Sequence, residues 1–464
     1  MKKREREAFQ KNSEVELEIT DMSTEGAGIG KIQGFPFFVK DAVKGDIVKA
    51  KVMKCKKNYG FARLMEVISP SPDRIPAPCP IAGPCGGCQL QHLSYEAELR
   101  FKEKRVRDAL NRIGGIYIDD LTAAEEPIAA MAEPYRYRNK AQFPIGYGRD
   151  GKISAGFYVA RTHSIIPCSD CLLTPPEFSA IMQKLLEKMN EFHILPYNEN
   201  SGEGIFRHVL IRKGFGSGEI MVCLVAATED IPHLEELVEV LKGFPEIVSI
   251  CLNLNEERTN VILGSRTKTL WGKAYIMDKL DSLQFRISPL SFYQVNPYQA
   301  ERIYKKIVEY ASIGNAHRIW DLCCGIGTIS LFLAHAMPYC KVHGIEIVPE
   351  AIEDAKKNAV LNGISNVDFT AAAVEDQLQL MEGEADVVIA DPPRKGLLPS
   401  ALEAILKASP SHIVYMSCDP ATLARDLKVL CEGGYRLKAY QAYDFFSRTG
   451  HVETIVLLQG RDTL

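Results

Sequence analysis

The chain has 464 residues, of which 46% are hydrophobic and 25% charged, and its formal net charge is −4 at pH 7. This length exceeds one ordinary hydrophobic core and predicts two or three domains. The slightly acidic balance argues against a protein whose whole surface binds nucleic acid, and no apolar run reaches the roughly 18 residues of a membrane span. The N-terminus MKKREREAFQK has no apolar segment after its basic residues, so we expect no secretory signal and a cytoplasmic location.

Residues 1–70 predict a small barrel. The strand-like runs VELEIT, FPFFV, DIVKAKVMKC and YGFARLMEVI are separated by turns rich in glycine. This alternation is typical of an antiparallel barrel of about five strands. The segment is locally basic, with 14 Lys and Arg against 10 Asp and Glu. The proline-dense run SPSPDRIPAPCP (69–80) then indicates a linker or a domain edge.

The central part of the chain, residues 71–290, predicts a mixed α+β domain. The run SYEAELRFKEKRVRDALNRI (94–113) has a helical pattern and is followed by Gly114 and Gly115, which end the helix. From residue 135 onward, strand-like runs alternate with helical ones. Basic clusters at 102–107 and 136–140 are most often solvated faces, so by themselves they do not identify a binding surface.

A cysteine cluster lies at the start of this central part. The run CPIAGPCGGCQLQH (79–92) places Cys79, Cys85 and Cys88 within ten residues. In a reducing compartment, clustered cysteines indicate metal binding or catalysis rather than disulfides. Zinc and iron–sulfur clusters both accept thiolate ligands, so the spacing alone leaves both open.

From about residue 291 the pattern becomes a regular β–α alternation, which predicts a doubly wound sheet. The strand candidates are RIWDLC, KVHGIEI, ADVVIAD, HIVYMSC and HVETIVLL. The run RIWDLCCGIGTISLFLA (318–334) predicts a strand, a glycine loop and a helix, where the backbone comes close to a nucleotide-like ligand. Gly325 and Gly327 have no third glycine after them, so the loop alone is a weak signal.

Two acidic positions strengthen this signal. Glu346 ends the next strand, where a carboxylate accepts hydrogen bonds from ribose hydroxyls, and Asp391-Pro392-Pro393 follows a third strand at the edge where ligands bind. The loop, the acid and the DPP run together resemble class I S-adenosylmethionine-dependent methyltransferases; the alternative is an unrelated Rossmann-like loop. Enzymes of this fold that methylate amino groups usually have an aromatic residue after the prolines, whereas this chain has Arg394, which favours a different target atom.

Cys418 and Glu453 suggest what that atom is. In VYMSCDPATLARDL (414–427), Cys418 is either a buried thiol or a nucleophile at a strand end, where the helix that begins at Pro420 favours a thiolate. Asp419 opposes the thiolate unless its side chain caps that helix. Glu453, after the turn SRTG (447–450), is either a solvent-facing strand residue or a general base. A thiolate that adds to C6 of a uracil activates C5 for methylation, and a base then removes the C5 proton.

The runs SCDPATLARDL and GHVETIVLL, after DLCCGIGT and DPPRKG, resemble the RNA uracil-5-methyltransferase family. The resemblance implies that Cys418 is the nucleophile and Glu453 the base, with Asp419 in place of the family's asparagine. The family pattern Ser-Phe-x-Gln-x-Asn matches residues 291–296. The expected cofactor-binding residues are Gln294, Cys323 (at a position often aromatic in the family), Gly325, Thr328, Glu346 and Asp391.

The N-terminal part extends the resemblance. Family members that act on ribosomal RNA carry the same Cys-x5-Cys-Gly-Gly-Cys pattern and a distant fourth cysteine, which implies a [4Fe–4S] cluster on Cys79, Cys85, Cys88 and Cys171, with Cys168 as the alternative fourth ligand. Residues 13–70, with GAGIGK and NYGFARLMEV, resemble the TRAM domain, an OB-like RNA-binding barrel. The expected RNA contacts are Lys54, Lys56, Lys57, Tyr59 and Phe61; the alternative is that both rings belong to the barrel core.

Taken together, these patterns predict a TRAM-like barrel (1–70), a central α+β domain with an iron–sulfur cluster (71–290) and an α/β, Rossmann-like class I methyltransferase domain (291–464). The predicted function is methylation of uracil C5 in 23S ribosomal RNA by a monomer that binds no membrane. The resemblance implies this substrate because the family member acting on transfer RNA is expected to lack the barrel and the cluster. The alternatives are a uracil in transfer RNA or another RNA, an amino-directed or small-molecule methyltransferase, and a non-catalytic RNA-binding iron–sulfur protein.

Overall fold

A computed structural model describes residues 9–117, 124–160, 162–314, 316–380 and 385–460. The basic residues 1–8, which belong to the predicted N-terminal domain, lie outside this part. The chain divides into two compact units. The first unit comprises Met1–Arg105, Val159–Thr162 and Phe446–His451, and the second comprises Val106–Tyr158, His163–Phe445 and Val452–Leu464.

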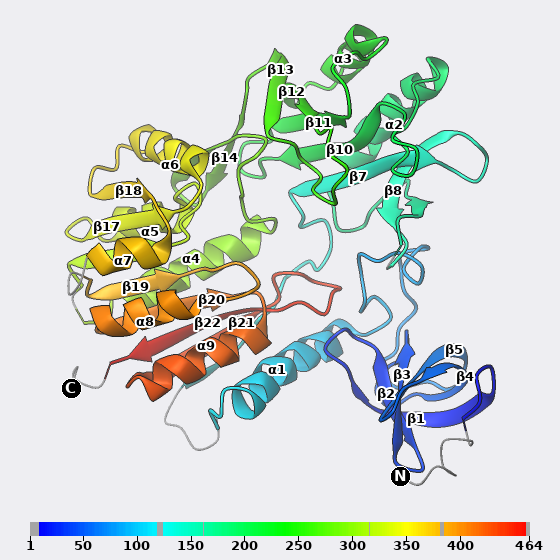
Figure 1. Ribbon diagram of the computed structural model, residues 1–464, viewed down its shortest axis with the longest axis horizontal. Coiled ribbons are helices and arrows are strands. Elements are labelled where there is room, and N and C mark those ends of the chain that lie inside the picture. The colour runs from blue at the N-terminus through cyan, green and yellow to red at the C-terminus, as the bar shows by residue number, and fades with distance from the viewer. Residues whose placement is uncertain (1–8, 118–123, 161, 315, 381–384, 461–464) are drawn as a thin grey trace. The chain divides into compact units, whose positions relative to one another are not determined.

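The first unit contains the predicted barrel. Its five strands close in the order β1-β2-β3-β5-β4 (Figure 1): β1 (Glu14–Met22), β2 (Gly28–Ile32), β3 (Phe35–Lys40), β4 (Ile47–Cys55) and β5 (Gly60–Ser69). The OB-like barrel is confirmed, but it is not wholly antiparallel, because β3 and β5 run parallel. Alternate residues such as Phe37, Val39, Val48 and Ala50 point inward and form its core.

The predicted helix at 94–113 is α1 (Tyr95–Arg112). Ser94 begins it by accepting a hydrogen bond from the Ala97 N–H through Oγ, at 3.3 Å, and another from the Glu98 N–H through its carbonyl. Gly115, with φ of +65°, lies just beyond its end, in the left-handed conformation that glycine favours at helix ends. The predicted helix bounds are therefore right to within one residue.

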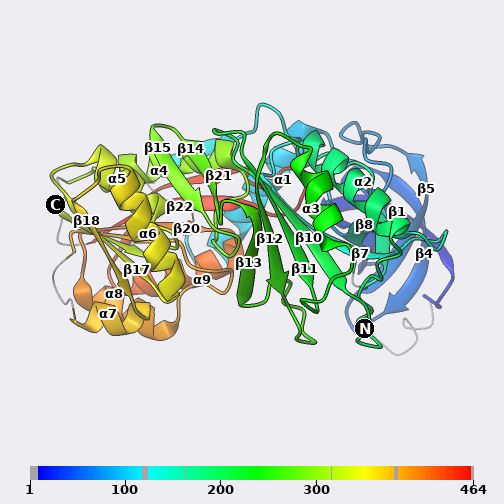
Figure 2. The same ribbon diagram turned by 90° about the horizontal axis from the view of Figure 1, so that it is seen from above.

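A seven-stranded sheet forms one part of the second unit, in the order β13-β12-β11-β10-β7-β8-β9. The strands are β7 (Lys140–Tyr147), β8 (Ile153–Tyr158), β9 (Ile165–Pro167), β10 (Phe206–Lys213), β11 (Ile220–Ala226), β12 (Ile247–Leu254) and β13 (Arg266–Gly272). Helices α2 (Pro176–Glu191) and α3 (Leu234–Lys242) cover one face (Figure 2), where Phe178, Leu185 and Leu237 join the core. A hairpin, β14 (Ile276–Leu280) and β15 (Leu283–Ile287), follows.

The other part of the second unit is an eight-stranded sheet in the order β18-β17-β16-β19-β20-β22-β21-β6. Its strands are β16 (Arg318–Leu322), β17 (Lys341–Glu346), β18 (Val367–Ala371), β19 (Val387–Ala390), β20 (His412–Ser417), β21 (Arg436–Tyr443), β22 (Glu453–Gln459) and β6 (Ala124–Ala129). Helices cover both of its faces (Figure 1): α4 (Pro297–Ala311), α5 (Thr328–Ala336), α6 (Pro349–Leu361), α7 (Val374–Leu380), α8 (Pro399–Ala408) and α9 (Pro420–Glu432). This is the predicted doubly wound α/β arrangement.

Two features of this sheet were not predicted. Strand β22 runs antiparallel to β20 and β21, which brings its first residue, Glu453, to the edge where β20 ends. Strand β6 comes from the predicted central domain, yet it pairs with β21. This pairing was not predicted because sequence position does not reveal which sheet a short strand extends. No helix among the described residues is long and apolar enough to cross a membrane.

Candidate active site

The glycine loop between β16 and α5 has the geometry of a ligand-binding turn. Gly325 and Gly327 have φ of +55° and +80°, a region that other residues rarely adopt. A Cβ on Gly327 would lie 2.9 Å from the Phe369 ring, whereas one on Gly325 would meet nothing within 4 Å. The loop is therefore packed on the Gly327 side and open at Gly325, where a ligand can approach the backbone.

Glu346 closes this loop from the neighbouring strand. Its Oε2 accepts a hydrogen bond from the Gly325 N–H at 3.1 Å, and its Oε1 accepts one from the Val348 N–H at 3.0 Å. The carboxylate is half-buried at the carboxyl end of β17. Each oxygen keeps a lone pair for a further donor, so Glu346 is suited to bind hydroxyl groups of a ligand in the loop.

Two aspartates lie behind the loop. Burial and the nearby Asp321 raise the pKa of Asp391 to about 7, and burial raises the pKa of Asp321 to about 7 as well. The Ser330 hydroxyl donates to Asp321 Oδ2 at 2.5 Å, while Oδ1 is buried and has no partner among the described residues. Because a buried oxygen without a partner is costly, Asp321 fits a donor group supplied by a ligand. It was visible in DLCCGIG but was not predicted as a site residue.

Cys418 lies one residue beyond β20, half-buried. Burial, with Glu453 and Asp391, raises its pKa to about 11, and Arg394 acts in the opposite direction. The helix after Cys418 was expected to favour the thiolate, but the net shift of the pKa is upward. Burial and two carboxyl groups outweigh one helix terminus.

Asp419 is turned away to cap α9. Its Oδ1 accepts hydrogen bonds from the Ala421 N–H at 2.9 Å and the Thr422 N–H at 3.1 Å, and Pro420 occupies the first turn. An N-cap of this kind stabilises a helix by about 1 kcal/mol. The side chain next to Cys418 is thus engaged with the helix backbone, which is the arrangement that removes its opposition to a thiolate.

Glu453 is the first residue of β22 and is only 3% exposed. The solvent-facing alternative is therefore excluded. Burial raises its pKa well above the usual value, Asp391 adds to the shift, and Arg394 opposes it. The same charged groups act on Cys418 and on Glu453, so the structure brings together Cys418, Glu453, Asp391 and Arg394.

Gln294 lies in the loop before α4, and this loop is fixed by its neighbours. The Asn139 side chain donates to the Gln294 carbonyl at 2.9 Å, and its backbone N–H donates to the Val295 carbonyl at 2.9 Å. Asn296 caps α4 by accepting from the Gln299 N–H and donates to the Phe445 carbonyl at 2.9 Å. Sequence reasoning missed Asn139, because no local pattern shows that it reaches residue 294.

The α4 helix also contacts the glycine loop. The Tyr304 hydroxyl lies 3.2 Å from Thr328 Oγ1, at the first residue of α5. Tyr304 is fully buried, and burial raises its pKa. Cys323, at the start of the loop, has φ of +64°, and burial raises its pKa to about 12. At neutral pH, both groups therefore act as neutral walls of the loop.

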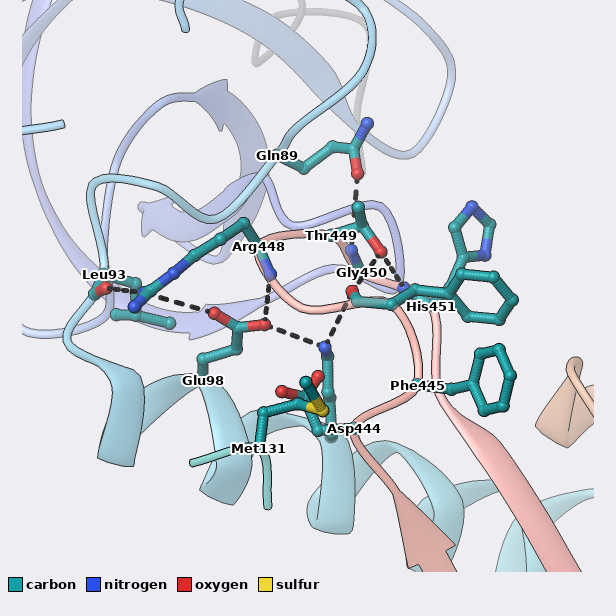
Figure 3. Close-up of polar contacts among 12 residues, drawn as sticks. Gln89, Leu93, Glu98, Met131, Asp444, Phe445, Arg448, Thr449, Gly450 and His451 are labelled. Carbon is teal, nitrogen blue, oxygen red and sulfur yellow. Dashed lines mark hydrogen bonds and ion pairs between the residues drawn. The ribbon is translucent and has the colours of Figure 1, made fainter. Parts of the chain in front are cut away.

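The turn that precedes Glu453 belongs to the first unit, where buried charges hold it (Figure 3). The Arg448 N–H donates to Glu98 Oε1 at 2.7 Å, and Lys102 Nζ donates to the same oxygen at 2.8 Å. The Gln89 and Leu90 N–H groups donate to the Arg448 carbonyl. Arg448, Glu98 and Lys102 are all at most 4% exposed. Sequence reasoning predicted the turn but not these contacts, which join residues about 350 positions apart.

The predicted metal ligands are divided between the two units. Cys79, Cys85 and Cys88 are half-buried in the first unit, and Cys168 and Cys171 are half-buried in the second. Among the described residues, no group of three or more His, Cys, Asp or Glu side chains is placed to hold a metal ion. A cluster on these cysteines therefore stays a prediction.

The barrel carries an exposed aromatic face. Tyr59 and Phe61 are each 37% exposed. Their ring centroids lie 5.5 Å apart, and those of Phe38 and Phe61 lie 5.7 Å apart. The alternative that both rings belong to the core is therefore excluded. Lys54, Lys56 and Lys57 are exposed in the same strand-and-turn segment.

Comparisons with known proteins agree with this geometry. Residues 248–461 match the family model described as tRNA (Uracil-5-)-methyltransferase, and residues 8–65 match the TRAM domain. The chain is 46% identical, over 97% of its length and 97% of the relative, to an uncharacterized RNA methyltransferase of Halalkalibacterium halodurans, and 46% identical to another of Clostridium tetani, over 97% of this chain and 96% of that one. The structure of Pyrococcus abyssi tRNA (uracil-54, C5)-methyltransferase with S-adenosyl-L-homocysteine covers 96% of this chain and 99% of its own, with 28% identity and a TM-score of 0.77.

Proposed function

Because the chain belongs to the RNA uracil-5-methyltransferase family, we propose that it methylates C5 of a uracil in 23S ribosomal RNA, with Cys418 as the nucleophile and Glu453 as the general base. The observation that carries this proposal is the meeting of a thiol and a buried carboxyl group beside the glycine loop. Cys418 and Glu453 share Asp391 and Arg394 as charged neighbours. The proposed domains are 1–70, 71–290 and 291–464, in a cytoplasmic monomer.

The proposed reaction needs one thiolate and one base. The Cys418 sulfur bonds to C6 of the uracil, and the electrons of the C5–C6 double bond shift to form an enolate. C5 then bonds to the donor's methyl carbon as the carbon–sulfur bond of the donor breaks. Glu453 accepts the C5 proton, and the electron pair left behind restores the double bond and expels the Cys418 thiolate.

Burial raises the pKa of both groups, which favours Glu453 as a base and disfavours the thiolate of Cys418. A carboxylate with a raised pKa is a stronger base than an exposed one, which favours removal of the C5 proton by Glu453. Cys418, with a pKa of about 11, needs help to ionise. Arg394 lowers the pKa of Cys418, so we infer that it supports the thiolate.

The glycine loop fits S-adenosylmethionine, which supplies an electrophilic methyl group on a sulfonium. The open backbone at Gly325 lets a nucleoside approach, and Glu346 has free lone pairs for its hydroxyls. Asp321 Oδ1, which has no partner among the described residues, suits an amino group. Gln294, Cys323, Thr328 and Asp391 complete the proposed set. The Pyrococcus abyssi structure holds the demethylated product of this donor.

The ribosomal substrate rests on the cysteine pattern alone. The Pyrococcus abyssi enzyme is named for a transfer RNA uracil and spans 96% of this chain, so an enzyme of this length is not restricted to ribosomal RNA. The sequence analysis inferred the ribosomal substrate from the presence of the barrel and the cluster. The length of the transfer RNA enzyme shows that domain content does not select the substrate. Transfer RNA is the second candidate, favoured by that structure.

One experiment separates the two substrates. The purified protein is incubated with methyl-labelled donor and unmodified transcripts of 23S ribosomal RNA or transfer RNA, and nucleosides are identified by mass spectrometry. We expect 5-methyluridine in the ribosomal transcript. Label only in transfer RNA would move the substrate and leave the chemistry intact, and no label in either RNA would favour a non-catalytic RNA-binding protein.

A second experiment tests the roles of the two residues. The Cys418→Ala variant is expected to lose methyl transfer and the covalent RNA adduct together. The Glu453→Gln variant is expected to accumulate the adduct, because proton removal precedes release of the thiolate. An amino-directed methyltransferase would instead keep most of its activity in Cys418→Ala, since its target atom is already nucleophilic.

We also propose a [4Fe–4S] cluster on Cys79, Cys85, Cys88 and Cys171. The support is the spacing of three cysteines within ten residues. Protein purified without oxygen is expected to be brown, with broad absorption near about 400 nm and bound iron. The Cys85→Ser variant should lose the colour and Cys168→Ser should keep it; a colourless protein that binds zinc would contradict the cluster.

A further inference from the structure

Three basic side chains gather at the start of β7 in the second unit. Lys140 is the first residue of β7 and pairs in register with Arg212 of β10. Arg138 lies two residues before it, close enough that both arginines lower the pKa of Lys140. Among the residues that the structure describes, no carboxylate forms an ion pair with any of the three. Because like charges repel, a bound anion would stabilise the three side chains.

Basic residues next to the cluster form ion pairs with carboxylates. Arg136, two residues earlier, binds Asp170 at 2.6 Å, and Lys213, next to Arg212, binds Glu177 at 2.6 Å. Carboxylates of the segment 170–177 are therefore available to basic residues next to the cluster. In the part of the chain that the structure describes, Arg138 and Lys140 have no carboxylate partner, unlike Arg136 and Lys213.

The side chains of the cluster are also partly removed from water. Arg138 Nε is buried and has no hydrogen-bond partner in the described part of the chain. Arg212 is only 2% exposed, and its guanidinium donates to the carbonyls of Ser288 and Ser291 at 3.1 and 2.9 Å. Burial, Arg212 and Arg138 lower the pKa of Lys140 to about 8. A cation whose pKa is lowered in this way gains most from a bound anion.

The cluster is tied to the loop that carries Gln294. Asn139, between Arg138 and Lys140, holds the carbonyls of Gln294 and Val295. The carbonyls that accept from Arg212 belong to Ser288 and Ser291, just before the same loop. An anion bound by the cluster would therefore lie beside the loop that carries Gln294.

We propose that Arg138 and Lys140, backed by Arg212, bind a backbone phosphate of the RNA substrate next to the reacting nucleotide. This inference rests on the proposed function, because that function makes RNA the substrate. The phosphate contact would hold the RNA near the reacting nucleotide. A guanidinium and an ammonium together match the charge and the several acceptor oxygens of a phosphate. A single carboxylate, such as that of the methyl donor, would leave more of the positive charge unpaired.

The test measures RNA binding without methyl transfer. Wild-type protein and the variants Arg138→Gln, Lys140→Met and Lys213→Gln are titrated with a 23S ribosomal RNA transcript between about 50 and about 200 mM KCl, in the absence of donor. Each variant that removes a phosphate contact is expected to lower the slope of log Kd against log salt by about 0.7–0.9. Lys213→Gln is the matched control, because Glu177 already neutralises Lys213.

Stability and donor binding complete the test. Loss of one positive charge from the cluster should not lower Tm. If Arg138→Gln proves unstable, Arg138→Lys serves in its place and should keep the wild-type slope of log Kd against log salt. Unchanged slopes in Arg138→Gln and Lys140→Met would overturn the proposal. Weaker donor binding with an unchanged RNA slope would assign the cluster to the donor's carboxylate and would overturn it as well.

The outcomes also separate this inference from the proposed reaction. If the wild-type protein makes 5-methyluridine but the slopes do not change, only the phosphate contact is wrong. If the slopes change while Cys418→Ala still transfers methyl groups, the phosphate contact stands and the covalent mechanism is wrong.

Discussion

Asn139 binds the loop of Gln294 at two consecutive carbonyls. Its side chain donates to the Gln294 carbonyl at 2.9 Å, and its N–H donates to the Val295 carbonyl at 2.9 Å. Asn139 is 1% exposed, so water does not compete for these bonds. The central sheet thus sets the position of a residue that the cofactor site is proposed to use.

The Asn139→Ala variant should therefore bind the donor more weakly. Removal of the side chain leaves the Gln294 carbonyl without its donor, which costs about 1–3 kcal/mol and corresponds to roughly a 5- to 150-fold rise in Kd. Calorimetric titration with S-adenosylhomocysteine measures this change. Asn190→Ala is the control, since Asn190 bridges the Ile153 and Leu186 carbonyls away from the loop; an equal loss of affinity there would contradict a specific role for Asn139.

The reactivity of Cys418 should follow the charge at Arg394. Because burial and Glu453 raise the pKa of Cys418 to about 11 while Arg394 lowers it, alkylation should accelerate about tenfold per pH unit from pH 7 until the thiol ionises. Arg394→Gln should slow alkylation at any fixed pH, and Arg394→Lys should not. Mass spectrometry of the Cys418 peptide gives the rate; a rate that is constant from pH 7 to 10 would contradict the raised pKa.

The fold was largely predictable from the sequence because its signals are local. Apolar alternation marked the barrel, and the β–α rhythm after residue 291 marked the doubly wound sheet. Gly325, Asp391 and Cys418 each follow a strand in sequence and Glu346 ends one, so their shared edge was expected. Asn139 carries no local pattern, and it reaches Gln294 only through the folded chain. The antiparallel insertion of β22, which places Glu453, likewise depends on tertiary pairing.

The electrostatics were less predictable than the positions. The helix after Cys418 suggested a lowered pKa, but burial and two carboxyl groups raise it. Sequence shows which charges are adjacent along the chain, whereas a pKa depends on desolvation and on groups from other strands. Asp419, the neighbour that looked unfavourable, is engaged in capping α9.

The buried network around Arg448 should control the stability of the first unit. Glu98→Ala would leave Arg448 and Lys102 buried without their carboxylate, which costs about 3–5 kcal/mol. We expect a clearly lower Tm for the barrel transition in a calorimetric scan. Glu96→Ala removes an exposed glutamate from the same helix turn and should change stability by no more than about 0.5 kcal/mol. Equal effects of the two substitutions would rule out the network as the cause.

The aromatic face of the barrel should bind RNA bases. Tyr59→Ala and Phe61→Ala are each expected to weaken binding of a 23S ribosomal RNA transcript by about 1–3 kcal/mol, because each ring offers a stacking surface. Tyr59→Phe keeps the ring and should bind like the wild type. Filter binding at one salt concentration measures the difference, and unchanged affinity in both alanine variants would show that this face does not touch RNA.

The fate of the uracil C5 hydrogen tests the central claim most directly. RNA made with uridine tritiated at C5 is incubated with the protein and unlabelled S-adenosylmethionine, and tritium released to water is compared with methyl groups transferred. The proposed reaction releases one tritium for each methyl group in the wild-type protein, and Cys418→Ala releases and transfers none. Methyl transfer without tritium release would show that another atom is methylated and would contradict the roles of Cys418 and Glu453.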